Sequence, residues 1–398
     1  MRYASRTFLL LALSASMILL ASCGQKSNCS GITFGGTGGG SNPGGLNNSG
    51  GTVCGSGSSN QGGSSGSDLV YYRGGSGGSN AINTGELTAT TFKILAGVSA
   101  AVGNSTVGNM VIVNKKFLYL PDQNSSGGVM GFQINRSSGA LTAIPNSPFA
   151  APHAVTTIAA DPDSKGGRYL YVADFTTGNF STYTINPTSG ALSLVSGSTI
   201  ASTIAPSALY VDGTGSYIYG DGGTTTGELY GFSIDQNSGA LSPIAGSPFS
   251  LGARDIQISP DGAWVLVNSG ASSIDVIPIE AGTGTLLTAS AVTYPTANPV
   301  GSISLNPNGN FLYTCTPKFP MEGYSFSGGA LTALNGSPYT ALSDMGDCQF
   351  DQSGTALFGI VTTTNAIGVR IINPSNGDVA GGIADLPVAT NNFFAVTN

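Results

Sequence analysis

Charged residues are scarce in this 398-residue chain: only 8% are Asp, Glu, Lys or Arg, with one histidine and one tryptophan. The 13 basic residues face 20 acidic ones, which gives a formal net charge of −7. So few basic residues cannot neutralise many phosphates, and we therefore expect no nucleic-acid partner. A lone histidine and scattered carboxylates also predict no histidine-rich metal site, no calcium loop and no bound cofactor.

Helical periodicity is missing as well. No window shows a convincing 3.6-residue period, whereas the alternation typical of strands recurs throughout. The chain contains 60 glycines and 20 prolines, which favour turns between short strands. We therefore predict an all-β fold.

The N-terminus has the features of a targeting segment. Arg2 and Arg6 precede an apolar run over residues 8–20, which is too short and too near the terminus for a comfortable membrane span. The run ends in Leu20-Ala-Ser-Cys23, which resembles the bacterial lipobox. The resemblance implies that residues 1–22 are a signal peptide and that Cys23 is lipidated. The alternative is ordinary secretion with an unmodified Cys23.

Lipidation of Cys23 would make a bacterial membrane a partner of this protein and place the rest in the cell envelope, outside the cytoplasm. Gly24 at the next position resembles an outer-membrane sorting preference. Loss of Arg2 and Arg6 with the signal would leave 11 basic residues against 20 acidic ones, a net charge of −9. From Cys23 to Asp68 the chain is mostly Gly, Ser and Asn, so we expect a disordered tether over 23–68.

The remaining head, residues 69–398, contains a repeat built around a glycine turn. Its copies are Gly85-Glu-Leu, Gly139-Ala-Leu, Gly190-Ala-Leu, Gly239-Ala-Leu, Gly284-Thr-Leu, Gly329-Ala-Leu and Gly377-Asp-Val. The steps between these glycines are 54, 51, 49, 45, 45 and 48 residues, a period typical of β-propeller blades. We interpret each glycine as a turn residue at positive φ.

Each copy supplies four predicted strands. In the fourth copy these are 208–212, 217–219, 229–235 and 241–244, with the glycine turn between the third and fourth. The N-terminal copy lacks a first strand, and residues 392–398 provide one at the other end of the head. The sequence therefore predicts a seven-bladed β-propeller of four antiparallel strands per blade. Its ring is closed by the C-terminal strand joining the N-terminal blade.

The strongest motifs accompany the turn glycines. They are Gly131-Phe-Gln-Ile-Asn135, Ser138-Gly-Ala-Leu-Thr142 and Asn146-Ser-Pro-Phe149, with counterparts over 231–249 and 323–339. In these motifs the head resembles the lactonase-like seven-bladed propellers, relatives of bacterial 6-phosphogluconolactonases. The resemblance implies an active site at the mouth of the central channel that uses His, Arg and acidic residues. A fold shared by many proteins cannot by itself transfer the reaction.

Three residues are candidates for catalysis. His153 lies just before the first strand of the third blade, near the expected channel mouth, and histidine is the natural base near neutral pH. Arg254 and Asp255 hold a similar position before the fifth blade, where Arg254 could stabilise an oxyanion and Asp255 could direct water. Asp344 and Asp347, at the seventh blade, are candidate binding residues. The alternative for all five is a polar residue at a turn or rim.

The head contains two cysteines, and Cys29 and Cys54 lie in the tether. Cys315 is expected on the second strand of the sixth blade and Cys348 on the first strand of the seventh. An oxidising compartment would allow a Cys315–Cys348 disulfide if the Cα atoms lie within about 7 Å. Two buried thiols are the alternative.

The leading interpretation is a lipid-anchored extracytoplasmic propeller that binds a small molecule or a protein as a scaffold. The first alternative is a lactone hydrolase acting at the channel mouth. A structural cell-surface protein is the second. A phosphorylated sugar is disfavoured as substrate, because no cluster of Lys and Arg could hold its phosphate. Convergence of His153, Arg254 and a carboxylate in one pocket would favour the enzyme.

Overall fold

The computed structural model describes residues 68–74, 81–88, 91–102, 109–122, 127–174, 176–202, 206–222, 227–364, 366–387 and 390–396. These lie in the compact unit formed by residues 65–398. The predicted signal peptide, Cys23, Cys29, Cys54 and all but the last residue of the predicted tether lie outside the described residues. Among the described residues, no helix is long and apolar enough to cross a membrane.

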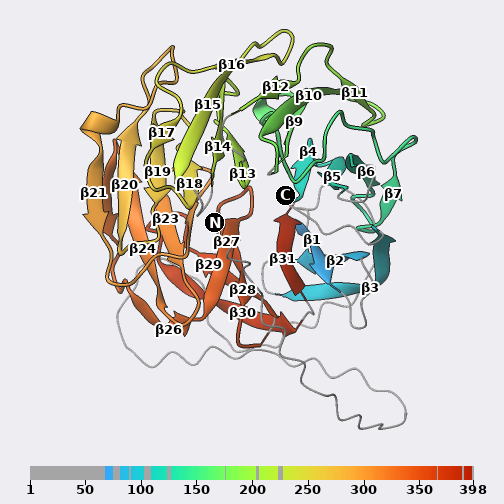
Figure 1. The fold of residues 1–398 in the computed structure, drawn as a ribbon. Helices are drawn as coiled ribbons and strands as arrows, with labels where there is room; N and C mark the ends of the chain where they lie inside the picture. Colours follow the sequence, from blue (N-terminus) through green and yellow to red (C-terminus); the bar gives the residue numbers. More distant parts are fainter. Residues whose placement is uncertain are drawn as a thin grey trace, which may run out of the picture. The chain divides into compact units, whose positions relative to one another are not determined.

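Within this part of the chain, seven antiparallel sheets form the blades of a propeller (Figure 1). Blade 1 contains β1 (Asp68–Gly74), β2 (Ala81–Leu87), β3 (Phe92–Ala101) and β31 (Thr390–Val396), and blade 2 contains β4 (Val111–Val113), β5 (Phe117–Pro121), β6 (Val129–Ile134) and β7 (Leu141–Ala143). Blade 3 contains β8 (Thr157–Ala160), β9 (Tyr169–Ala173), β10 (Asn179–Ile185), β11 (Leu192–Leu194) and β12 (Ile200–Ala201). Blade 4 contains β13 (Ala208–Val211), β14 (Tyr217–Asp221), β15 (Glu228–Ile234), β16 (Leu241–Pro243) and β17 (Phe249–Ser250).

Blade 5 contains β18 (Asp255–Ile258), β19 (Trp264–Asn268), β20 (Ser273–Pro278) and β21 (Val292–Pro295). Blade 6 contains β22 (Ser302–Leu305), β23 (Phe311–Cys315), β24 (Pro320–Ser327), β25 (Ala330–Ala333) and β26 (Tyr339–Ser343). Blade 7 contains β27 (Met345–Phe350), β28 (Ala356–Val361), β29 (Ala366–Ile372) and β30 (Val379–Pro387). In blades 2 to 7 the four main strands follow one another in sequence order, and β12, β17 and β26 add short pairings to the third strands of their blades. The fold predicted from the repeat is confirmed.

The two ends of the propeller share one blade. The C-terminal strand β31 pairs antiparallel with β1, so that Val70 faces Val396 and Tyr71 faces Ala395. Blade 1 therefore has the order β3-β2-β1-β31, with β31 as its first strand. The predicted closure by a C-terminal strand is confirmed, and it gives blade 1 the first strand that the N-terminal segment lacks.

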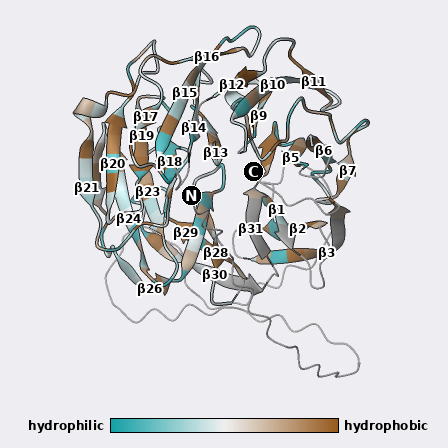
Figure 2. Cartoon of the chain, viewed as in Figure 1, coloured by the Kyte–Doolittle hydropathy of each residue, from teal (hydrophilic) through white to brown (hydrophobic). Residues whose placement is uncertain are grey.

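The hydrophobic core lies between the blades. Seven clusters of buried side chains each draw residues from two neighbouring blades; one, for example, joins Tyr219 and Leu229 of blade 4 to Val265 and Val267 of blade 5. Strands such as β19 and β20 accordingly show hydrophobic residues, drawn in brown, in Figure 2. Because both faces of a blade are covered by its neighbours, the middle strands carry long apolar runs.

Six turn glycines fasten each blade to the one before it: Gly139, Gly190, Gly239, Gly284, Gly329 and Gly377. All have φ between 72° and 84°. In blade 5, a Cβ on Gly284 would lie 2.4 Å from the ring of Tyr217 in blade 4. The buried hydroxyl of Tyr219 donates a hydrogen bond to the Gly284 carbonyl oxygen at 2.6 Å. Glycine is therefore needed for close approach as well as for its backbone conformation.

The same docking recurs around the ring. Gly190 packs on Phe117 and accepts a hydrogen bond from Tyr119, and Gly377 packs on Phe311 and accepts one from Tyr313. Gly329 packs on Trp264, which places this tryptophan in the interface between blades 5 and 6. The aromatic residues that recur on second strands thus form the surface on which the turn of the next blade packs.

The prediction that Gly85 occupies an equivalent turn is wrong. Gly85 lies inside β2, opposite Val70 of β1, and the backbone N–H and hydroxyl of Thr88, just after β2, donate hydrogen bonds to the Thr91 carbonyl instead. Glycine is required there because a Cβ would meet the ring of Phe92 at 2.5 Å. Phe92 contacts Phe358 of blade 7 edge to face, with centroids 5.9 Å apart, so an aromatic pair takes the place of the turn at the closing interface.

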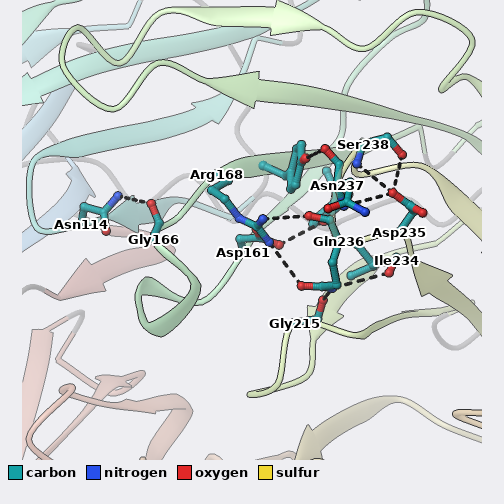
Figure 3. Close-up of polar contacts among 12 residues, drawn as sticks. Asn114, Asp161, Gly166, Arg168, Gly215, Ile234, Asp235, Gln236, Asn237 and Ser238 are labelled. Carbon is teal, nitrogen blue, oxygen red and sulfur yellow. Dashed lines mark hydrogen bonds and ion pairs between the residues drawn. The ribbon is translucent and has the colours of Figure 1, made fainter. Parts of the chain in front are cut away.

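Blade 3 and blade 4 are joined by a further polar contact, drawn in Figure 3. Arg168 donates hydrogen bonds to the backbone oxygen of Gln236 at 2.8 Å and to its Oε1 at 3.2 Å, while its Nε lies 3.6 Å from Asp161. Tyr169 donates to the Asn237 carbonyl at 2.6 Å. Arg168 and Tyr169 of blade 3 thus hold the turn that precedes Gly239 in blade 4.

We expect Gly284→Ala to destabilise the propeller more than Gly282→Ala. Both glycines have positive φ, but a Cβ on Gly282 would meet nothing within 4 Å. The Gly282 variant should lose about 1–2 kcal/mol of unfolding free energy through the left-handed backbone alone. The Gly284 variant should lose roughly 1–3 kcal/mol more through the clash with Tyr217. Urea unfolding of both variants measures the difference, and equal losses would contradict the docking role.

Candidate functional site

The first strands of the blades enclose a cavity of about 730 Å³ at the centre of the ring. Its walls come mainly from β13, β18, β22 and β27. A second cavity of about 350 Å³, lined by residues from the opposite ends of first strands such as Ala160 and Asp161, shares Gln349 and Phe350 with the first. The larger cavity includes the starts of β13, β18, β22 and β27 and is called the channel cavity below.

One cation and three carboxylates line the larger cavity: Arg254, Asp221, Asp255 and Asp347. Arg254 immediately precedes β18, and its side chain lies over Gly270, where a Cβ would be only 2.5 Å from it. The side chain is exposed. Within the part of the chain that the structure describes, the Arg254 guanidinium forms no ion pair, so it is available to an anionic group in the channel.

Asp255 is the first residue of β18 and lies between two other blades. Its carboxylate accepts a hydrogen bond from the Ile303 backbone N–H of β22 at 2.8 Å and from the Tyr210 hydroxyl of β13 at 3.1 Å. Burial raises the pKa of Asp255 to about 7, and the charges of Asp221 and Asp347 add to the rise, although both hydrogen bonds favour the ionised form. A carboxylate poised near neutrality suits general base catalysis.

Tyr210 connects two of the carboxylates. Its hydroxyl lies 3.1 Å from Asp255 Oδ1 and 3.3 Å from Asp221 Oδ2, and it has one proton to donate. Asp221, at the end of β14, is almost fully buried and also accepts a hydrogen bond from Ser207. Burial, with the two carboxylates next, holds the pKa of Tyr210 well above its usual range, so that the hydroxyl remains a donor.

Tyr210 and Asp221 were not predicted from the sequence. Tyr210 lies 45 residues from Asp255, and only the ring arrangement brings the two together. Tyr210 also sits in a Leu-Tyr-Val stretch that reads as ordinary strand sequence. The one available signal is that β14 ends in Asp221, whereas β5 and β9 end in apolar residues at the matching position.

Asp347 and Asp344 have different surroundings, although both lie at positive φ near the start of blade 7. Asp347 lines the cavity as an exposed residue, and the protein atoms around its carboxyl still raise the pKa of Asp347 by removing part of its hydration. Asp344 accepts hydrogen bonds from the Thr362 hydroxyl and the Thr363 backbone. Burial tends to raise the pKa of Asp344, but these bonds outweigh it and the net shift is downward. Asp344 therefore fastens a turn.

His153 is not among the residues that line the cavity. Its Nδ1 lies 2.7 Å from the Ala154 carbonyl oxygen, which only accepts, so Nδ1 donates there. Its Nε2 lies 3.0 Å from the Ser181 hydroxyl of β10. His153 precedes β8 by four residues, as Asn298 precedes β22, and Asn298 is held in the same way by Glu322 of β24. Both residues tie the connection between blades to the third strand of their own blade.

The structure joins Cys315 of β23 to Cys348 of β27 by a disulfide, with Cα atoms 6.0 Å apart. The bond links blade 6 to blade 7, and Cys348 lies in the cavity wall beside Asp347. Among the described residues, no group of three or more His, Cys, Asp or Glu could hold a metal ion. The arrangement offers instead a cation, a base of near-neutral pKa and several hydroxyls and amides.

Comparison with known proteins agrees with the seven-bladed fold. The model of the family described as "Lactonase, 7-bladed beta-propeller" matches residues 71–318, more than half of the chain. The chain belongs to this family. No curated protein sequence matches it.

Among solved structures, the lactonase-family chain is similar to a candidate 6-phosphogluconolactonase from Bacteroides fragilis, with TM-score 0.63, 18% identity, and coverage of 84% of this chain and 99% of that one. A second from Bacteroides uniformis gives TM-score 0.66, 16% identity, and coverage of 83% and 99%. The periplasmic gluconolactonase of Pseudomonas aeruginosa gives TM-score 0.63, 16% identity, and the same coverage. At these identities the likeness concerns the fold.

The raised pKa of Asp255 predicts a pH-dependent stability. The protonated side chain is preferred in the folded protein, so the stabilisation it brings is present at low pH and is lost as the pH rises through about 7. Asp255→Asn retains an oxygen for the Ile303 N–H and removes the ionisation. We expect the unfolding free energy of this variant to fall less than that of the wild type between about pH 5 and about pH 9.

Asp344→Asn is the matched control, because the pKa of Asp344 is lowered and its effect has the opposite sign. Its carboxylate stabilises the fold above the unfolded-state pKa and loses that effect in acid, so Asp344→Asn should be less stable than the wild type at neutral pH. Urea titrations across the pH range test both. Parallel curves for the wild type and Asp255→Asn would contradict the burial of Asp255.

Proposed function

We propose that this protein hydrolyses a neutral, hydroxyl-rich lactone in the larger channel cavity. The proposal rests on the observation that Arg254 and Asp255 line the same cavity and that burial raises the pKa of Asp255 to about 7. Membership of the lactonase family supports this reading over a scaffold without chemistry. A scaffold that binds its ligand without turnover remains an outcome of the test below.

The proposed reaction needs no group beyond those in the channel. The Asp255 carboxylate removes a proton from water as the water oxygen bonds to the lactone carbonyl carbon. The guanidinium of Arg254 stabilises the negative charge that develops on the carbonyl oxygen. The bond between the carbonyl carbon and the ring oxygen then breaks, and the ring oxygen takes up a proton to become the hydroxyl of the product acid.

The charge of the cavity favours a substrate without phosphate. Among the described lining residues, three carboxylates accompany one cation, Arg254, so a phosphate dianion would be repelled by more charges than attract it. Other polar residues of the wall include Gln257, Gln349, Ser302, Ser304 and Asn109, whose amides and hydroxyls suit sugar hydroxyls. The solved relatives named for 6-phosphogluconolactone and gluconolactone mark the two substrates to compare.

We expect the full-length protein to hydrolyse glucono-δ-lactone and to prefer it to its 6-phosphate. Asp255→Asn should lower kcat/KM by about 10²- to 10⁴-fold, the usual contribution of a general base. Arg254→Ala should lower it by about 10²- to 10³-fold through loss of oxyanion stabilisation. Because the pKa of Asp255 is about 7, the rate should rise with pH and level off above that value.

His153→Ala is the matched control, since His153 holds a loop by Ser181 and does not line the cavity. It should retain the wild-type kcat/KM in a pH-stat assay. Binding of lactones with no turnover would favour the scaffold, and turnover that survives both Asp255→Asn and Arg254→Ala would sink the proposed site.

We further propose that the protein acts in the cell envelope, anchored through lipid on Cys23, because a lipobox-like sequence follows the N-terminal apolar run. Expressed in a bacterium with radiolabelled palmitate, the wild type should carry label and partition with the membrane fraction. Cys23→Ala should lose both properties. A soluble wild-type protein free of label would overturn the anchor without touching the proposed reaction.

A further inference from the structure

Tyr210 faces two carboxylates, one in its own blade and one in the next. Its hydroxyl oxygen lies 3.3 Å from Oδ2 of Asp221 in blade 4 and 3.1 Å from Oδ1 of Asp255 in blade 5. A tyrosine hydroxyl carries a single proton, so it donates to one of the two carboxylates at a time. Because both acceptors lie around the same oxygen, rotation of the O–H bond is enough to exchange them.

Asp255 is held at both of its carboxylate oxygens. Oδ1 accepts the hydrogen bond from Tyr210, and Oδ2 accepts one from the Ile303 backbone N–H of β22 at 2.8 Å. The backbone donor is fixed in its strand, whereas a hydroxyl can turn. Of these two hydrogen bonds, only the one from Tyr210 can therefore follow a change in the charge of Asp255.

Asp221 gives the Tyr210 hydroxyl its second position. Asp221 ends β14 and is almost fully buried, and its Oδ1 accepts a hydrogen bond from Ser207 while its Oδ2 faces Tyr210. A hydroxyl that loses its acceptor inside a protein costs free energy. With two acceptors in reach, the Tyr210 hydroxyl keeps a partner whether Asp255 is ionised or protonated.

Within the described part of the chain, four other charged or titratable side chains line the channel cavity with Asp255. They are Tyr210 of β13, Asp221 of β14, Arg254 directly before β18 and Asp347 of β27. Burial is the main cause of the raised pKa of Asp255; the hydrogen bonds from Ile303 and Tyr210 oppose the rise, and the charges of Asp221 and Asp347 add to it. Tyr210 and Asp221 therefore act on Asp255 in opposite directions.

We infer that Tyr210 and Asp221 are positioning residues for the base Asp255: the Tyr210 hydroxyl donates to Asp255 while that carboxyl is ionised and turns to Asp221 once Asp255 holds a proton. This inference rests on the proposed lactone hydrolysis, in which Asp255 changes charge in every turnover. Burial holds the pKa of Tyr210 well above its usual range, so its O–H bond stays intact. The proton that moves is the one that Asp255 takes from water, and its release to the leaving ring oxygen or to solvent turns the hydroxyl back.

Two substitutions should move the pH profile of kcat/KM in opposite directions. Tyr210→Phe removes a donor to ionised Asp255, so the midpoint of the profile should rise by about one pH unit. Asp221→Asn removes a nearby negative charge, and its amide can donate to the Tyr210 oxygen, which directs the hydroxyl proton to Asp255. The midpoint should then fall by about one pH unit. A pH-stat assay with glucono-δ-lactone measures both profiles.

Tyr183→Phe is the matched control. It also removes a tyrosine hydroxyl that donates a hydrogen bond, but the acceptor is the Ala150 carbonyl oxygen at 2.7 Å, and Tyr183 is not among the residues that line the channel cavity. Its profile should keep the wild-type midpoint. If Tyr210 and Asp221 only supported the fold, their variants would lower kcat/KM and leave the midpoint where it is.

Urea unfolding provides a readout that needs no activity. The protonated form of Asp255 is preferred in the folded protein, so its stabilising effect is lost as the pH rises through the folded-state pKa, about 7 in the wild type. Each protein is compared with a counterpart that also carries Asp255→Asn, and the difference in unfolding free energy isolates this carboxyl. The pH at which the difference levels off should rise in Tyr210→Phe and fall in Asp221→Asn.

The two readouts separate this inference from the proposed reaction. A wild type that hydrolyses no lactone defeats the proposed function, and the urea differences still decide whether Tyr210 and Asp221 control the ionisation of Asp255. A midpoint that stays in place, or moves against the stated direction, in either variant overturns the inference. If one variant does not fold, the direction of the shift in the other decides. Opposite shifts in the two variants, with the Tyr183→Phe midpoint unchanged, support it.

Discussion

The docking of a turn glycine against the aromatic second strand of the preceding blade is the contact on which this ring depends. This contact requires glycine for two reasons. The backbone of Gly190, Gly239, Gly284 and Gly377 has φ near 74°, and a Cβ at any of these positions would lie only 2.4–2.6 Å from an aromatic ring of the preceding blade. Because each blade docks on the last, the register of one is passed to the next. Both faces of every blade are then covered, which explains why so little charge is present in the chain.

This constraint also explains how much of the fold the sequence could reveal. The period, the four strands per blade and the closing strand were all predictable, because turn glycines and second-strand aromatics recur at nearly fixed spacing. Gly85 was misassigned because glycine serves two purposes that look alike in sequence. At Gly239 it permits a left-handed turn, whereas at Gly85 it leaves room for Phe92 within a strand. Only the pairing of β1 with β2 distinguishes them.

The candidate site was predictable in part. Arg254, Asp255 and Asp347 lie at the starts of first strands, and the ring brings these three positions to one cavity. His153 has the residue type expected of a catalyst, yet it fills the place that Asn298 fills in blade 6, and its neighbour Ser181 lies in a third strand. Tyr210 and Asp221 could not be foreseen, since their role depends on contacts between blades and not on any local motif.

The scarcity of charge makes the channel groups effective. Burial is the main cause of the raised pKa of Asp255, and the charges of Asp221 and Asp347 add to it because they act through a medium less polarisable than water. The burial that raises the pKa of Asp255 to about 7 makes its ionised form costly to the fold and useful as a base at the same pH. The blades must therefore hold β18 and β27 firmly enough to keep these groups in place. Two contacts of the sixth blade provide that restraint. Its turn glycine, Gly329, packs on Trp264 of blade 5, and its Cys315 is bonded to Cys348 of blade 7.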